Sequence, residues 1–163
     1  MTITFNADEI FEMAEEIERI AAAFYREVAK KASDKKIKQT LIDLAAMEDG
    51  HLRTFEQMRK QLTSREKTET VFDPDNQAAL YLQTMANSRG TEGKIGQTQK
   101  LTGKEKTEEI LRIAINSEKN SVVFYVGLKD LVPTEAGKDK VEEIITEEMG
   151  HIAVLNKELA AFA

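Results

Sequence analysis

The chain has 163 residues, among them 29 acidic and 23 basic side chains, two histidines and no cysteine. This length is typical of one domain that can bury a core of its own, so we expect residues 1–163 to form a single domain. The lack of cysteine excludes disulfides, thiolate metal sites and thiol nucleophiles, and a net charge of −6 without a basic stripe argues against a nucleic-acid partner.

The first residues of the chain lack the basic start and the apolar run of a secretory signal. No stretch of sequence approaches the ~18 apolar residues that a membrane-spanning helix needs. We therefore expect a cytoplasmic protein with no membrane partner.

The N-terminal part of the chain predicts two helices, because its apolar residues recur at spacings of three and four. Asn6 and Glu9 have the spacing of a capping box, and the apolar stripe that follows them predicts a helix over about residues 7–32. A second stripe with the same rhythm predicts a helix over about residues 34–62.

Residues 63–102 lose this pattern and are rich in turn-forming residues, with one short helix predicted over Ala78–Ala86. A helix of ~28 residues is ~42 Å long, and about 13 extended residues are enough to run back along it. The segment is therefore predicted to be a long crossover between two pairs of helices.

The C-terminal part of the chain predicts a second pair of helices. Thr102 and Glu105 have the spacing of a capping box and predict a helix over about residues 103–130, and the stripe after Pro133 predicts another over about residues 134–160. Four long amphipathic helices, joined in pairs by short turns, predict an all-α fold: a four-helix bundle with one long crossover.

The two pairs of helices resemble each other residue by residue. Residue n matches residue n + 100 at positions that include Glu9/Glu109, Ile10/Ile110, Ala14/Ala114, Glu18/Glu118, Phe24/Phe124, Tyr25/Tyr125, Glu48/Glu148, Gly50/Gly150 and His51/His151. This indicates a duplicated helical hairpin. A pseudo-two-fold axis across the bundle would bring the repeated residues face to face.

Both histidines of the chain lie in this repeat, each three residues after a glutamate. Residues three apart are neighbours on a helix surface, so each glutamate and its histidine project to the same side, which is the side of the apolar stripe. Another glutamate precedes each pair by 30 residues, on the preceding helix. Six side chains are therefore candidate metal ligands: Glu18, Glu48, His51, Glu118, Glu148 and His151.

Four carboxylates buried together would cost many kcal/mol unless they were protonated or met cations. Two divalent metal ions would offset the four negative charges, and neutral imidazoles would add none. The sequence therefore predicts a dinuclear metal site. Two alternatives stay open: a duplicated bundle that has lost its site, and core histidines that only hydrogen-bond to the glutamates.

The same residues carry a resemblance to a known family. The chain resembles the rubrerythrin branch of the ferritin-like superfamily in the segments Glu18-Arg-Ile-Ala-Ala-Ala-Phe24-Tyr25, Glu48-x-x-His51, Glu118-Lys-Asn-Ser-Val-Val-Phe124-Tyr125 and Glu148-x-x-His151. The resemblance implies a ferritin-like bundle in which Glu48 and Glu148 bridge two metals. It also implies that the remaining ligands divide into two sets, Glu18 with His51 and Glu118 with His151.

Two departures from the family bear on activity. Rubrerythrins append a four-cysteine iron site that delivers electrons, whereas this chain has no cysteine and would need a separate electron-donor protein. Rubrerythrins also resemble one another in an extra carboxylate one turn beyond the glutamate of the third long helix, which is Glu118 here. At that position this chain has Ser121, and the repeat position holds Ala21.

Six further residues near the candidate ligands support more than one interpretation. Tyr25 and Tyr125 follow Glu18 and Glu118 by two helical turns, and either hydrogen-bond or redox contact with the site or simple core packing fits that spacing. The repeated mid-helix glycines Gly50 and Gly150 indicate a close packing contact, a helix distortion or inheritance from the duplicated ancestor. Asp49 and Glu147, which lie next to Glu48 and Glu148, are expected to be solvated rather than bonded to a ligand.

The leading hypothesis is a rubrerythrin-like oxidoreductase, a peroxide reductase or ferroxidase. It would hold two metal ions, most simply iron, with manganese or zinc as alternatives and no haem, and would act on peroxide or dioxygen as a homodimer or higher homo-oligomer. Other open functions are an iron-binding, storage or sensing bundle without turnover, a di-manganese catalase, and a metal-free helical interaction module.

Overall fold

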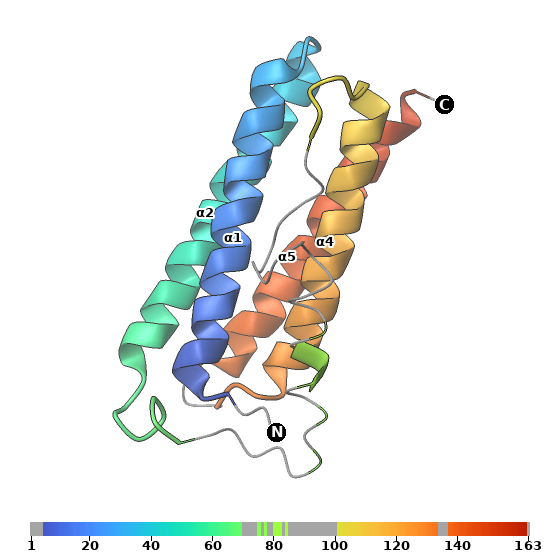
Figure 1. The fold of residues 1–163 in the computed structure, drawn as a ribbon. Coiled ribbons are helices and arrows are strands. Elements are labelled where there is room, and N and C mark those ends of the chain that lie inside the picture. Colours follow the sequence, from blue (N-terminus) through green and yellow to red (C-terminus); the bar gives the residue numbers. More distant parts are fainter. Residues whose placement is uncertain are drawn as a thin grey trace.

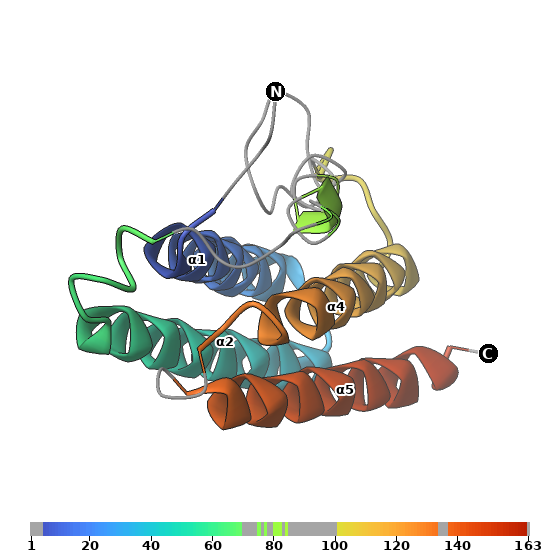
Figure 2. The same cartoon turned by 90° about the horizontal axis from the view of Figure 1, so that it is seen from below.

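The structure is a computed structural model that describes residues 5–69, 75, 77, 80–82, 84, 101–133 and 137–162. Its long helices are α1 (Ala7–Lys31), α2 (Lys35–Gln61), α4 (Thr107–Lys129) and α5 (Lys138–Ala160). α1 packs against α2 and α4 against α5, and the view in Figure 2 shows α1 beside α4 and α2 beside α5. The all-α four-helix bundle is as predicted.

The directions of the helices explain the long connection. α1 and α5 run one way along the bundle and α2 and α4 run the other way (Figure 1), so α2 ends at the opposite end of the bundle from the start of α4. The chain between them must run the length of the bundle. Of the helix predicted over Ala78–Ala86, residues 80–82 and 84 are helical, and the others lie outside the described residues.

The first two helices begin and end within one residue of the prediction. The capping box is formed at the start of α1, where the Glu9 backbone N–H donates to Asn6 Oδ1 and the Asn6 N–H donates to Glu9 Oε2, both at 2.9 Å. At the start of α2 the carboxylate of Asp34 accepts from the Ile37 N–H at 2.9 Å. Each cap satisfies a backbone donor that the helix itself leaves free.

The predicted start of the third long helix at residue 103 is wrong by four residues, because α4 begins at Thr107. The Thr102 N–H and hydroxyl do donate to Glu105 Oε1, both at 2.6 Å. However, Gly103 has φ +82°, a left-handed conformation that no α-helix continues through, so these bonds close a separate turn ahead of the helix.

The predicted start of the fourth long helix at residue 134 is wrong for a similar reason. α5 begins at Lys138, directly after Gly137, whose φ of +101° is incompatible with a helix. Residues 134–136 lie outside the described part of the chain.

The core consists of two apolar clusters, one toward each end of the bundle. One cluster contains Ile10, Phe11, Phe55, Phe124, Tyr125 and Ile144, and the other contains Phe24, Tyr25, Leu41, Ile110, Leu111 and Leu155. Partners in the sequence repeat fall in opposite clusters, as Tyr25 and Tyr125 do, which is the arrangement a two-fold axis across the bundle produces. Between the clusters lies a layer of buried polar side chains.

The connection after α2 packs against α4 through Tyr81 and Leu82. The side chain of Leu82 is fully buried in one core cluster, and the hydroxyl of Tyr81 donates to the carbonyl oxygen of Val123. The ring of Tyr81 lies on Gly127, where a Cβ atom would overlap it. Glycine at 127 therefore allows the connection to lie close to α4.

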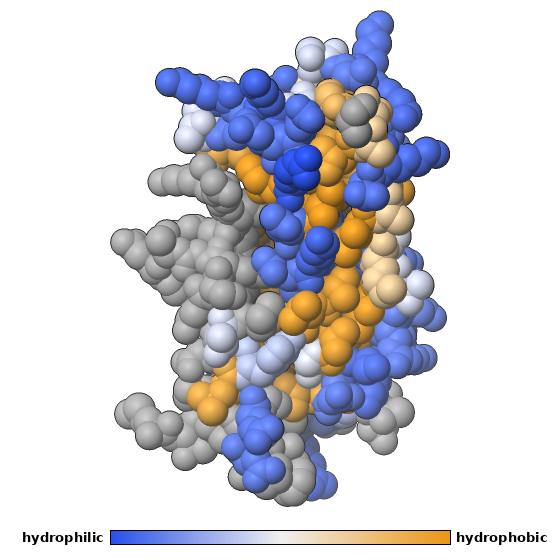
Figure 3. Space-filling model, turned by 90° about the vertical axis from the view of Figure 1, so that its right-hand side faces the viewer, coloured by the Kyte–Doolittle hydropathy of each residue, from blue (hydrophilic) through white to orange (hydrophobic). Residues whose placement is uncertain are grey.

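Apolar side chains also gather on the outside of the bundle. Figure 3 shows them as a band along the face formed by α4 and α5, and the large apolar side chains that these two helices expose are Val123, Val126, Met149 and Val154. Within the described residues, no helix is both long enough and apolar enough to cross a bilayer.

Gly50 and Gly150 do not make the close packing contact that their repetition suggested. A Cβ at Gly50 would come no nearer than 3.9 Å to Arg53 Nη2, and a Cβ at Gly150 would have no described atom within 4 Å. Both glycines lie within unbroken helices. Inheritance from a duplicated ancestor remains as their explanation.

The variants G50A and G150A are each expected to stabilise the protein by about 1 kcal/mol, because alanine removes the helix penalty of glycine and meets open space. Thermal unfolding followed by circular dichroism should show Tm rising by about 2–4 °C for each change. G127A is the matched control and should lower Tm, because the same added methyl group overlaps Tyr81. A fall in Tm for G50A and G150A would mean that the added methyl groups do not meet open space.

Candidate metal centre

Six polar side chains meet in the layer between the two apolar clusters, and they are the six candidate ligands of the sequence. They come from all four long helices: Glu18 on α1, Glu48 and His51 on α2, Glu118 on α4, and Glu148 and His151 on α5. Each is at most 3% exposed. The periodicity of the helices brings them together, because each lies on the stripe that faces the bundle axis.

The carboxylate of Glu48 faces both histidines at once. Its Oε2 lies 3.3 Å from His51 Nδ1, and its Oε1 lies 3.1 Å from His151 Nδ1. Glu148 does the same, with Oε1 at 3.1 Å from His51 Nδ1 and Oε2 at 3.2 Å from His151 Nδ1. Each of these two glutamates therefore offers one oxygen to each half of the centre, which is the geometry of a bridging carboxylate.

The other two glutamates each belong to one half. Glu18 Oε2 lies 3.6 Å from His51 Nδ1, and Glu118 Oε1 lies 3.7 Å from His151 Nδ1. Two groups result in which all ligand atoms lie within 4.8 Å of one another, and they share Glu48 and Glu148. The imidazole rings are stacked with their centroids 5.6 Å apart.

Several buried atoms of the centre have no hydrogen-bond partner among the described residues. These are Glu18 Oε2, Glu48 Oε1, Glu148 Oε2 and both ring nitrogens of His151. Buried lone pairs without donors are rare in folded proteins because each costs free energy. Here most of them face the shared interior of the centre, where bound cations would satisfy them, so the residues present fit a pair of divalent metal ions.

Two tyrosines brace the centre across the bundle. The hydroxyl of Tyr25 on α1 donates to Glu118 Oε1 on α4, and the hydroxyl of Tyr125 on α4 donates to Glu18 Oε1 on α1. Both rings are almost fully buried. Of the two interpretations of these tyrosines, hydrogen bonding to a candidate ligand is the one the geometry supports. Each bond joins one hairpin to the other. In Glu18 the bond leaves Oε2 facing His51, whereas in Glu118 the oxygen that accepts from Tyr25 is also the one that faces His151.

The sequence model of the ferritin-like domain family matches residues 6–161, almost the whole chain. The chain belongs to the ferritin-like domain family. A solved structure, that of a candidate ferritin-like diiron-carboxylate protein from Thermotoga maritima, is similar to this ferritin-like chain with a TM-score of 0.72 and 25% sequence identity over 98% of each chain. No curated protein matches the sequence significantly. The ferritin-like bundle implied by the sequence resemblance is confirmed, and the rubrerythrin subtype stays a prediction.

In the metal-free ferritin-like chain, the two non-bridging glutamates are poor acids. Burial raises the pKa of Glu118 to about 7 against the opposing contact with His151, and the negative charge of Glu148 adds to the rise. Burial likewise raises the pKa of Glu18 well above its ordinary value, although the close contact with His51 opposes the change. Glu18 and Glu118 therefore hold protons more readily than ordinary glutamates when no cation is present.

For the two histidines and for Glu48 and Glu148, the glutamates that face both histidines, the pKa shifts favour the charged form. Burial alone would lower the pKa of His151, but its contacts with Glu118, Glu148 and Glu48 outweigh burial and raise it to about 12. The pKa of His51 is raised in the same way. Burial would raise the pKa of both bridging glutamates, and contact with the two histidines lowers it instead. Without metal, imidazolium charge compensates the bridging carboxylates.

The expectation that Asp49 and Glu147 are both merely solvated is wrong for Glu147. Although its side chain is 54% exposed, Glu147 Oε2 lies 2.7 Å from His51 Nε2, the ring nitrogen that faces away from the centre. Asp49 instead forms an ion pair with Arg26 at the surface. The sequence did mark Glu147 as unusual: it directly precedes the candidate ligand Glu148, and it is an acid where the other copy of the repeat has Met47.

The position one turn beyond Glu118 holds a small polar side chain rather than a carboxylate. Ser121 is buried, and its hydroxyl donates to the carbonyl oxygen of Ser117 at 3.3 Å. Its repeat partner Ala21 is half-buried. The extra carboxylate of rubrerythrins thus has no counterpart at either position.

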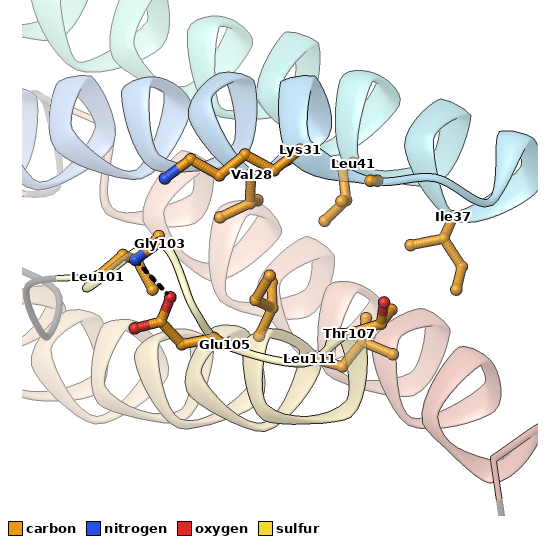
Figure 4. A pocket seen from close by; sticks show the side chains of 11 residues that line it. Val28, Lys31, Ile37, Leu41, Leu101, Gly103, Glu105, Thr107 and Leu111 are labelled. Atoms are coloured by element: carbon orange, nitrogen blue, oxygen red, sulfur yellow. Dashed lines mark hydrogen bonds between the residues drawn. The ribbon is translucent and has the colours of Figure 1, made fainter.

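A separate cavity of about 140 Å³ lies at the end of the bundle where α1 ends and α4 begins. Figure 4 shows apolar side chains such as Val28 and Leu111 on its walls, together with the charged residues Lys31 and Glu105. It contains none of the six candidate ligands. Val28 is ten residues from Glu18, about 15 Å along the helix, so the cavity is distinct from the centre.

Proposed function

We propose that this ferritin-like chain is a non-haem di-iron carboxylate protein that transfers electrons from two metal ions to the O–O bond of peroxide or dioxygen. One observation carries the proposal: the two oxygens of Glu48 and of Glu148 are divided between the two histidines. Glu48 and Glu148 would each hold both metal ions of such a pair, which would place the two ions close enough together to act on one peroxide or dioxygen molecule. The similarity to a candidate diiron-carboxylate protein adds support.

The donor set favours iron without requiring it. Carboxylate oxygens and imidazole nitrogens suit Fe(II) and Mn(II), whereas intrinsic affinity alone would favour zinc. Four carboxylates and two neutral imidazoles around two divalent ions give a centre with no net charge, which suits burial between two apolar clusters.

Bound as a pair, two ferrous ions would supply two electrons that, with two protons, convert one hydrogen peroxide into two waters, each iron becoming ferric. The residues of the chain do the positioning. Tyr25 and Tyr125 hold the non-bridging glutamates by hydrogen bonds, and the apolar clusters on both sides keep bulk water away. Because the chain has no cysteine, the electrons that restore the ferrous state are proposed to come from a separate donor protein.

The test of this proposal is metal loading followed by rapid mixing with oxidant. The metal-free protein is loaded anaerobically with Fe(II), its iron content is measured by mass spectrometry, and the diferrous protein is mixed in a stopped-flow instrument with peroxide or with dioxygen. We expect two irons per chain and oxidation of two ferrous ions by each peroxide. Faster oxidation by peroxide indicates a peroxide reductase, and faster oxidation by dioxygen indicates a ferroxidase.

Other outcomes would contradict the proposal. Fewer than about one iron per chain would leave a structural role. A diferrous form inert to both oxidants would leave iron binding without turnover. Release of dioxygen from peroxide by the manganese-loaded protein without any reductant would indicate a catalase.

We also propose that the chain works as a homodimer or higher homo-oligomer. The exposed apolar band on α4 and α5 is consistent with contact between copies. The mass measured by light scattering after size exclusion distinguishes the functions: a dimer fits an enzyme, and an assembly of a dozen or more chains fits iron storage.

A further inference from the structure

The two histidines of the centre differ in what their outer ring nitrogens contact. His51 has its Nε2 2.7 Å from Glu147 Oε2. His151 has a buried Nε2 for which the described residues provide no hydrogen-bond partner. The inner Nδ1 atoms have glutamate oxygens at similar distances, 3.1–3.6 Å from His51 and 3.1–3.7 Å from His151, although only the Nδ1 of His51 has hydrogen-bond geometry, with Glu148 Oε1.

The sequence repeat shows why the two halves are unequal. Glu147 on α5 corresponds to residue 47 on α2, one position before the bridging glutamate in each copy, and residue 47 is methionine. A thioether is at best a weak hydrogen-bond acceptor. The six candidate ligands are repeated without change, so the copies differ in a residue that supports a ligand and not in the ligands.

An acceptor on the outer nitrogen changes what the inner nitrogen can do. A carboxylate that accepts the Nε2 proton fixes the tautomer, so that the Nδ1 lone pair is free to coordinate metal, and it holds the ring in position and makes it a stronger donor. Loss of such a partner typically weakens metal binding about 10–100-fold. His51 has this support from Glu147, and His151 lacks it from the described residues.

We propose that Glu147 is a positioning residue that makes the metal position of Glu18 and His51 the tighter of the two, so that the centre loads in order. The position of Glu118 and His151 fills second. This inference rests on the proposed function only in its claim that the six residues bind metal, and it does not require any redox activity. Ordered loading would let a chain with one metal bound exist as a distinct state.

The two histidines make the order directly observable. The chain contains no other histidine, so protein labelled with ¹⁵N-histidine has just two imidazole rings to resolve by NMR, assigned by comparison with H151Q. Metal-free protein is titrated with Zn(II), which is redox-inert and diamagnetic. We expect the first equivalent to shift the Nδ1 signal of His51 and the second to shift that of His151, with affinities about 10–100-fold apart.

Four variants separate positioning from general damage to the fold, and both substituted residues are partly exposed. E147M should bring the two affinities together, whereas E147Q, which keeps a carbonyl acceptor without the charge, should leave an intermediate gap. M47E gives His151 the missing partner and should tighten the second position. The double variant E147M/M47E should reverse the order.

Simultaneous loading of both rings in the native protein, or an unchanged order in E147M, would overturn the inference and leave the dinuclear centre intact. Failure of Zn(II) to shift either histidine would overturn this inference together with the metal-binding part of the proposed function. Failure of the iron-loaded protein to react with oxidants would overturn the proposed redox function alone.

Discussion

Replacing Glu48 and Glu148 together by glutamine is expected to reduce metal binding from two ions per chain to fewer than one. Each of these carboxylates faces both histidines, so the double variant removes two of the three carboxylates from each metal position. The fixed negative charge of the centre falls from four to two. Two divalent cations would then bring an uncompensated positive charge into a buried site, which is strongly unfavourable.

The measurement is metal content after loading with iron or zinc and removal of excess metal. E158Q is the matched control. Glu158 is on α5 with Glu148, is only 6% exposed and undergoes the same chemical change, but its carboxylate pairs with Lys36 away from the centre. E158Q should still bind two metals. If E48Q/E148Q also bound two, the six residues would not form the metal centre.

The residues that meet in the centre could be predicted because helices repeat regularly. Glu48 and His51 share a side through their spacing of three, and the apolar stripe shows which side faces the core. The duplication then places the second pair opposite the first. These arguments need only the helix period and the repeat, and so they hold although both C-terminal helices start four residues later than predicted.

What the sequence could not supply depends on contacts between elements. Tyr25 could be assigned to a helix face, but the rotation and separation of the helices decide that its hydroxyl reaches Glu118 on the opposite hairpin rather than a nearer group. Glu147 lies on the outer side of α5, and only the packing of α2 against α5 shows that it reaches His51. Gly103 likewise has a left-handed conformation that its neighbours alone did not indicate.

Metal removal is expected to change both the thermal stability and its dependence on pH. The folded metal-free chain holds a proton on Glu118, whose pKa is raised to about 7, over a range in which the unfolded chain has already released it. Glu18 shifts in the same direction. The folded state then binds more protons than the unfolded state, so the free energy of unfolding falls as pH rises from about 4.5 to about 7.

The histidines extend this decline to higher pH. His151, with its pKa raised to about 12, keeps a proton that the unfolded chain loses above about pH 6.5, and His51 is raised in the same sense. Their contribution to stability is complete below that pH and declines above it. The bridging glutamates, whose pKa is lowered, contribute stability above about pH 4.5 that is lost in stronger acid. The metal-free centre therefore favours folding most in mild acid.

Metal ions reverse this preference, because they bind deprotonated carboxylates and neutral imidazoles and displace the protons. A ligand present at 100 times its Kd stabilises the folded state by about 2.7 kcal/mol, so two metals add about 5 kcal/mol. For a chain of this size that corresponds to a rise in Tm of about 10–20 °C at pH 7.5. The rise should shrink toward pH 5, where protons compete for the same atoms.

Calorimetry of the metal-free and zinc-loaded protein at pH 5, 6 and 7.5 measures both effects. The metal-free Tm should fall across this series while the difference caused by zinc grows. E48Q/E148Q, which lacks the bridging charges, should show no rise with zinc at any of the three pH values. A metal-free Tm that increased from pH 5 to pH 7.5 would mean that Glu18 and Glu118 are also ionised without metal, and that the protein, rather than bound cations, compensates the charge of all four carboxylates.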